Sequence, residues 1–222
     1  IMLNQVSVKQ EPLKGLSAAF SGADVAYANL EIPLTNATTA TPYKSAADIR
    51  ARNQFILKAD PGHIKGIKAA GFDLISTANN HGMDYGWKGL SQMIGLLNQA
   101  GIAHSGGGKD IASAEQVAVY RLPSGYRVGL IAALAFVGSG GLNACGPAKK
   151  DAPGIAVFRF EGQMGPAAKA EVRRRVSEAK RKCDFLIVAP HWGIEKQSKP
   201  RDWQLVLGRA LIDAGADAVI GS

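Results

Sequence analysis

The sequence contains little cysteine and no long apolar run. Cys145 and Cys183 are the only cysteines among 222 residues, and they form no CxxC pair, which excludes a thiolate-type metal site. The two thiols are compatible with one bridge in an exported protein or with free cysteines in a cytosolic one. No apolar run approaches the length that crosses a bilayer, and no signal-peptide pattern opens the chain.

Acidic residues are outnumbered by basic ones. The chain carries 26 Lys and Arg against 18 Asp and Glu, a net charge of +8, and residues 169–182 hold much of the excess. That segment has no aromatic side chain to stack on bases, so a solvated helix face is favoured over nucleic-acid binding. A hydrophobic content of 46% excludes a disordered chain, and we expect one domain over residues 1–222.

Helix and strand patterns alternate along the chain, which predicts an α/β fold with a mixed sheet. Helices are expected at 61–70, 87–100, 165–182 and 200–214, and strands at 25–30, 72–77, 116–122, 127–134, 185–189 and 218–220. The strands at 116–134 are joined by Pro-Ser-Gly and are predicted to form a hairpin. The irregular segments 37–47 and 138–153 are long enough to be lids or mobile insertions.

Three of these strands share a spacing that periodicity alone does not require. Each begins near an aspartate and ends, seven positions later, at a residue type that binds metals; the pairs are Asp24 and Glu31, Asp73 and Asn80, and Asp184 and His191. A fourth copy begins at Asp217, and its seventh position falls after residue 222. Ligands of open α/β sheets collect outside the carboxyl ends of the strands, so we expect Glu31, Asn80 and His191 to converge.

A carboxylate, an amide oxygen and an imidazole suit divalent Zn, Mn, Fe or Mg. The alternative is that Asn79 and Asn80 serve a tight strand-to-loop turn, because Asn tolerates left-handed backbone. Three such residues in register favour a metal site, with the turn left to Asn79 alone. Since three ligands do not complete a metal shell, we expect others from water or from beyond residues 1 and 222, where both chain ends look like interrupted strands.

Five segments together resemble a known family. They are ADVAYANLEIPLT (23–35), GFDLISTANNHGMDYGWKGL (71–90), GIAHSGGG (101–108), PHWGIE (190–195) and LIDAGADAVIGS (211–222). They resemble the capsule-synthesis protein CapA family, which is linked to poly-γ-glutamate biosynthesis within the calcineurin-like metallophosphoesterase superfamily. The resemblance implies layered mixed sheets flanked by helices, with the family's first and last metal motifs outside this truncated domain.

The resemblance also implies roles for individual residues. Glu31 would be a carboxylate of a dinuclear centre, Asn80 and His191 would be metal ligands, and His81 would protonate the leaving group or stabilise the transition state. Glu31 stands where many phosphoesterases have Asp, which argues against efficient phosphatase chemistry. The implied function is a metal-dependent hydrolase of capsule or poly-γ-glutamate biosynthesis that acts on a phosphoester or amide bond. The alternative is a non-catalytic component that binds or exports the polymer.

Residues near His191 are candidates for contact with an anionic polymer or phosphoester substrate. Trp192 is predicted to wall the site, although it is about as well explained by packing. Lys196 and Lys199 could attract the anion, although exposed lysines are more often simply soluble surface. No nucleic-acid partner is expected. The family link further implies a membrane-bound polymer synthase complex and an extracytoplasmic or membrane-associated full-length protein.

Overall fold

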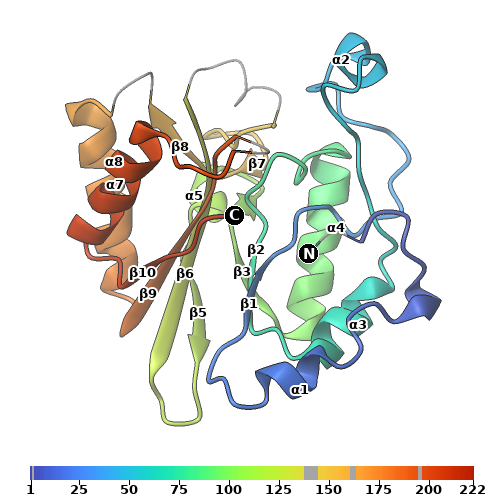
Figure 1. The fold of residues 1–222 in the computed structure, drawn as a ribbon, viewed down its shortest axis with the longest axis horizontal. Helices are drawn as coiled ribbons and strands as arrows, with labels where there is room; N and C mark the ends of the chain where they lie inside the picture. Colours follow the sequence, from blue (N-terminus) through green and yellow to red (C-terminus); the bar gives the residue numbers. More distant parts are fainter. Residues whose placement is uncertain (2, 138–144, 161–163, 195–196) are drawn as a thin grey trace.

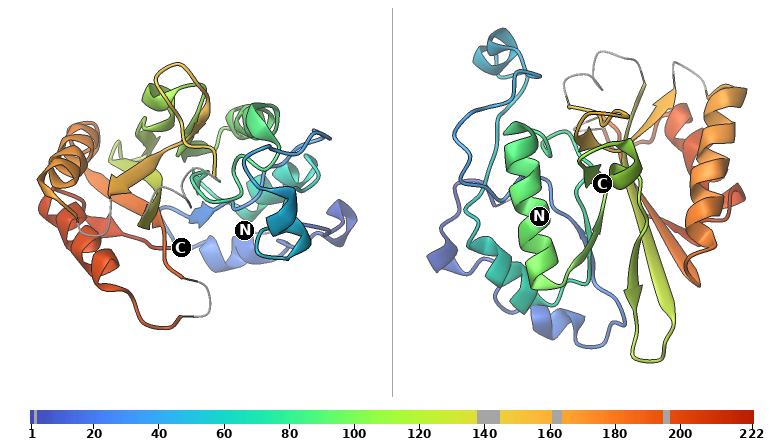
Figure 2. Two further views of the ribbon diagram at one scale, coloured as in Figure 1. Left: turned by 90° about the horizontal axis from the view of Figure 1, so that it is seen from above. Right: turned by 180° about the vertical axis from the view of Figure 1, so that it is seen from behind.

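Two main sheets face each other, and each is covered by helices on its outer side (Figure 1). This is a computed structural model that describes residues 1, 3–137, 145–160, 164–194 and 197–222. The view from above in Figure 2 places the two helical layers on opposite sides of the sheets. The layered α/β fold with sheets flanked by helices is therefore confirmed, and the order of layers is helices, sheet, sheet, helices.

The first sheet is parallel, and its three strands come in chain order. These strands are β1 (Tyr27–Asn29), β2 (Leu74–Ser76) and β3 (Ala103–Ser105), and the helices beside them are α1 (Leu16–Phe20), α3 (His63–Ala70) and α4 (Gly86–Ala100). Apolar side chains of α3 and α4 pack with Leu30 and Ile75 in one core. Gly71 and Gly101 end these helices in left-handed conformation, directly after the predicted last residues 70 and 100.

The second sheet is mixed and has β6 at its centre. Its strands are β5 (Ala118–Arg121), β6 (Arg127–Val137), β8 (Val157–Phe160), β9 (Phe185–His191) and β10 (Ala218–Val219). The β5–β6 pair is antiparallel and is the predicted hairpin, whereas β8 and β9 pair with β6 in parallel. Helices α7 (Pro166–Lys180) and α8 (Asp202–Asp213) cover the outer face with a second core.

A third core fills the space between the sheets. Leu74 of β2 packs there with Leu130 and Ala132 of β6 and with Ile187 and Ala189 of β9. The next residues along β6 and β9 point to the helical side, as the two-residue period of a strand requires. This packing fixes one sheet against the other, so loops that follow β1, β2 and β9 can meet.

The short helices and strands were not predicted, and several of the predicted helices and strands were longer than the observed ones. The elements without a predicted counterpart are η1 (Val8–Gln10), α1, α2 (Ala46–Arg50), β3, β4 (Gly107–Gly108), α5 (Ile111–Ala114), β7 (Gly154–Ile155) and β8. Helix α8 begins at Asp202 instead of residue 200. Of the segment 138–153, residues 138–144 lie outside the described residues.

Two further observations concern the cysteines and the helices. Cys145 and Cys183 are buried in separate cores, so they do not form a disulfide with each other. Within the described part of the chain, no helix combines the length and apolar character needed to cross a bilayer.

Three of the recurring aspartates form the same reciprocal contact with a neighbouring strand. The backbone N–H of each aspartate donates to the carbonyl of one residue, and its carboxylate accepts the N–H of that same residue. The distances are 2.9 and 2.9 Å for Asp73 with Ala26, 2.9 and 2.8 Å for Asp184 with Arg127, and 3.0 and 2.6 Å for Asp217 with Leu186. This contact, called here the aspartate clamp, fixes the register of parallel strands, whereas Asp24 is exposed.

The clamp at Asp184 predicts a specific acid response. Arg127 donates two side-chain hydrogen bonds to the carboxylate and lowers the pKa of Asp184 to about 2, from an ordinary value of about 3.9. A lowered folded-state pKa gives stability that is complete above about pH 4 and is lost as the pH falls through about 2. We therefore expect Asp184→Asn to flatten the loss of stability between pH 4 and pH 2, measured by denaturant unfolding at each pH.

The exposed Asp24 provides the matched control, and Asp24→Asn is expected to keep the acid slope of the wild type. Identical slopes for the wild type and Asp184→Asn would contradict the clamp as a source of stability.

Candidate metal centre and adjoining cavity

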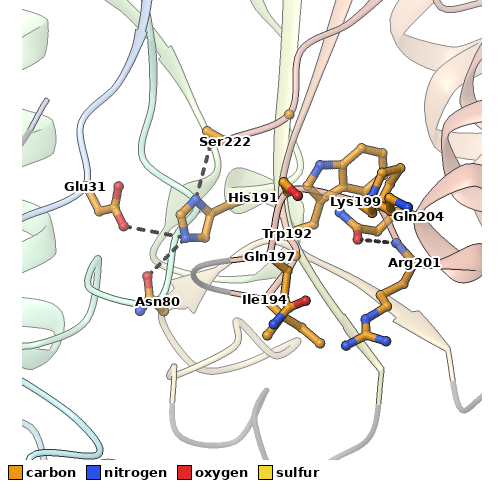
Figure 3. A pocket seen from close by; sticks show the side chains of 14 residues that line it. Glu31, Asn80, His191, Trp192, Ile194, Gln197, Lys199, Arg201, Gln204 and Ser222 are labelled. Atoms are coloured by element: carbon orange, nitrogen blue, oxygen red, sulfur yellow. Dashed lines mark hydrogen bonds and ion pairs between the residues drawn. The ribbon is translucent and has the colours of Figure 1, made fainter.

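Glu31, Asn80 and His191 lie together where strands of both sheets end (Figure 3). The Nε2 atom of His191 is 3.1 Å from Asn80 Oδ1 and 3.7 Å from Glu31 Oε1. His191 is the last residue of β9, Asn80 follows β2 and Glu31 follows β1. The convergence expected from the seven-residue spacing is therefore present, and we call this set the three-donor centre.

The three-donor centre fits a divalent ion in donor chemistry and spacing. Two ligands about 2.1 Å from one ion and roughly at right angles lie about 3 Å apart, close to the separations found here. Burial lowers the pKa of His191, while Glu31 opposes that change and His81 adds to it. A neutral imidazole is the form that ligates a metal. Among the described residues, no group of three or more His, Cys, Asp or Glu side chains could hold a metal ion. The three-donor centre has two such side chains, because its third donor is an amide.

A pair of buried asparagines supports Glu31. Asn29 Nδ2 donates to Glu31 Oε2 at 3.1 Å, and Asn79 Nδ2 donates to Asn29 Oδ1 at 3.1 Å and to the Leu30 carbonyl at 2.9 Å. Asn79 Oδ1 also accepts the backbone N–H of His81 at 3.1 Å, which is the turn role predicted for it. Asn79 thus ties the ends of β1 and β2 together in addition to making a turn. Asn29 was not predicted as a site residue, although it stands two residues before Glu31.

His81 lies in a buried cluster beside the three-donor centre. Its Nδ1 is 2.7 Å from Asp84 Oδ2, and Lys44 Nζ donates to Asp84 Oδ1 and lies 3.2 Å from that Nδ1. Since a carboxylate only accepts hydrogen bonds, the Asp84 contact places the proton on Nδ1 and leaves Nε2 as the basic nitrogen. His81 is 8% exposed, and it is not among the residues that line the cavity described below.

Lys44 and Asp84 also hold the segment that precedes α3. Lys44 Nζ donates to the Phe55 carbonyl at 2.9 Å, and the Leu57 N–H donates to Asp84 Oδ2 at 2.7 Å. Neither residue was predicted to belong to the site. Asp84 had a local signal, because it follows His81 by three positions, whereas Lys44 had none.

A cavity of about 490 Å³ opens beside the three-donor centre. Trp192 lines it, as predicted, and packs edge-to-face on Trp203 with ring centroids 6.2 Å apart. A Cβ at Gly221 would lie 2.3 Å from Trp192 Nε1, so this close approach of backbone to indole requires glycine. Lys199 also lines the cavity, and Lys196 lies outside the described residues.

Comparisons with known proteins agree on one family. The model of the family described as "Bacterial capsule synthesis protein PGA_cap" matches residues 3–222. The PGA biosynthesis protein CapA of Bacillus subtilis is 31% identical over 202 residues, which are 91% of this chain and 47% of that protein. The capsule biosynthesis protein CapA of Bacillus anthracis is 31% identical over 172 residues, 78% of this chain and 39% of the relative.

A third relative carries a different name. A probable polyglutamine synthesis accessory protein of Mycobacterium tuberculosis is 29% identical over 201 residues, 90% of this chain and 50% of its own length. The chain therefore spans about half the length of the curated relatives it matches.

The buried Lys44–Asp84 pair predicts a large stability effect. Lys44→Met removes the cation and leaves the Asp84 carboxylate, which is 1% exposed, without its counter-charge. We expect the free energy of unfolding to fall by about 3–5 kcal/mol, measured by urea denaturation. Adding Asp84→Asn to that variant should restore part of the loss, because a neutral amide needs no counter-charge.

Lys65, exposed on α3, is the matched control, and Lys65→Met should change the free energy of unfolding by less than about 0.5 kcal/mol. Equal decreases in the free energy of unfolding for the two lysine variants would contradict a stabilising role of the buried Lys44–Asp84 pair.

Proposed function

Because this chain belongs to the bacterial capsule synthesis protein family PGA_cap, we propose that it acts in capsule or poly-γ-glutamate biosynthesis as a metal-dependent hydrolase. The family match over residues 3–222 and the printed names of the relatives support the pathway. We further propose an extracytoplasmic or membrane-associated location and work beside a membrane-bound polymer synthase. The accessory role in the name of the mycobacterial relative supports that partnership.

The observation that carries the hydrolase proposal is the three-donor centre itself. An amide oxygen and a carboxylate from two strand ends lie 3.1 and 3.7 Å from the imidazole of His191, which ends a third strand. Glu31, Asn80 and His191 would hold a divalent ion of the Zn, Mn, Fe or Mg class. A bound ion would supply Lewis acidity and a water of lowered pKa, suited to attack on a phosphoester or amide bond.

The surrounding residues of the chain have separate tasks in this proposal. Asn29 orients Glu31, and Asp84 holds His81 in the tautomer whose basic nitrogen is Nε2. His81 is the proposed proton-transfer residue, and the Lys44 ammonium balances the charge of Asp84 behind it. Trp192 gives the cavity an apolar wall that limits water beside the three-donor centre.

A second candidate function is a non-catalytic component that binds or exports the polymer. One observation favours it: the described residues gather no three acid, imidazole or thiol side chains, the usual set for a tightly held catalytic ion. Under this alternative, the cavity beside the three-donor centre would serve as a cleft for the polymer.

Substitutions at the centre separate these functions. We expect His191→Ala and Glu31→Gln to weaken metal binding roughly ten-fold or more, because each removes a ligand. We expect His81→Ala to keep its metal and lose turnover, because it removes the proton-transfer group alone. The measurements are metal content by elemental analysis and turnover of a phosphodiester and of poly-γ-glutamate by the full-length protein.

Glu171→Gln, an exposed change on α7, is the matched control and should leave both measurements unchanged. Bound metal without turnover of either substrate in the wild type would favour the binding component. A wild type that binds no divalent ion would overturn the metal centre.

A further inference from the structure

We propose that the cavity contains a cationic subsite, formed by Lys199 and Arg201, that holds a carboxylate of an acidic chain while a neighbouring bond lies at the three-donor centre. The inference deepens the proposed function and rests on it for the kind of chain. It assigns a place to the negative charge of the substrate, which the three-donor centre alone does not provide.

The cavity has two chemically different ends. Glu31 and Asn80 lie on one side of His191, and Arg201 and Gln204 lie on the other (Figure 3). All of them line the same cavity of about 490 Å³. Small-molecule sites commonly have volumes of about 300–1,000 Å³, so the cavity takes a short stretch of chain.

Charge is distributed unevenly between these ends. Glu31 is the only acidic side chain among the described residues that line the cavity, and it lies at the three-donor end. Lys199 and Arg201 lie at the other end, and neither pairs with an acidic side chain in the described part of the chain. By contrast, Arg127 on β6 forms an ion pair with Asp184, and Lys180 on α7 forms one with Asp217. Among the described side chains that line the cavity, positive charge is therefore concentrated at the far end, where it attracts an anionic group.

The backbone around the subsite is fixed while its cationic groups remain available. The Arg201 N–H donates to Gln204 Oε1 at 2.9 Å at the start of α8, which anchors the segment without using the guanidinium. Pro200 restricts the backbone between the two cations. The helix N-terminus adds a weak positive field, and the acidic Asp202 that follows does not line the cavity.

The wall between the two ends suits the backbone of such a chain. Trp192 is held by Trp203 and by the close approach of Gly221, and it presents an apolar surface. Gln197 and Gln204 add side-chain amides that can bond to the amides of a polymer. The cavity thus has the cationic subsite at one end, the apolar wall of Trp192 in the middle and the three-donor centre at the other end. A chain in which carboxylates alternate with amide bonds, as in poly-γ-glutamate, matches this order of surfaces.

The test is binding of a γ-linked glutamate tetramer by calorimetry, using the full-length protein at low salt. We expect the double variant Lys199→Ala/Arg201→Ala to bind roughly ten-fold more weakly than the wild type, because two exposed charge contacts are lost. Wild-type binding of the same tetramer with its α-carboxyls converted to amides should be weakened by a similar factor. Lys199→Ala alone should show an intermediate loss, and circular dichroism checks that each variant is folded.

The matched control is Lys169→Ala/Arg173→Ala, which removes two exposed cations from α7 outside this cavity. This control should bind within about two-fold of the wild type. Wild-type affinity in the Lys199→Ala/Arg201→Ala variant, or an equal loss in the α7 control, would overturn the subsite. So would binding of inorganic phosphate by Lys199 and Arg201 without binding of the tetramer.

The outcome also separates this subsite from the hydrolase proposal. Tetramer binding that depends on Lys199 and Arg201, in a protein with no metal and no turnover, supports the subsite and contradicts the hydrolase. Turnover with the same KM in the wild type and the double variant contradicts the subsite and supports the hydrolase.

Discussion

The aspartate clamp is the interaction on which the geometry of the site depends. In each clamp, the aspartate and one residue of the neighbouring strand form two hydrogen bonds. The aspartate N–H donates to the carbonyl of that residue, and the aspartate carboxylate accepts the N–H of the same residue. The strand therefore cannot slip without losing both bonds. A one-residue slip in a strand turns every side chain to the opposite face. Asp73 and Asp184 therefore determine where Asn80 and His191 stand, seven residues later, at the far end of their strands.

Buried polar groups complete the arrangement that the clamps begin. Asn79 bonds to Asn29 and to the Leu30 carbonyl, and Asp84 bonds to Lys44 and His81. Such groups are costly to bury unless every partner is present, so the two networks hold their members in one arrangement. The donors at the cavity surface thus rest on a layer of polar side chains that are hydrogen-bonded to one another and to the backbone.

How far the sequence predicts this structure depends on the range of each interaction. The alternation of helices and strands, the hairpin and the convergence of Glu31, Asn80 and His191 follow from apolar periods, turn residues and the rule for strand ends, all of which are local patterns. The Lys44–Asp84 and Asn29–Asn79 contacts join residues 40 and 50 positions apart, so no local pattern marks them. The two-residue strand β7 forms by pairing with β4, which is distant in the sequence, and a pattern of a few residues does not encode such a pairing.

The order of the strands along the chain has a consequence for assembly. The first sheet is built entirely from residues before 106, and the second from residues after 117, so the molecule consists of two consecutive halves that pack face to face. Glu31 and Asn80 belong to the first half, and His191 belongs to the second. Any ligand that contacts all three fastens the halves together, so occupancy of the cavity and resistance of the halves to separation are thermodynamically linked.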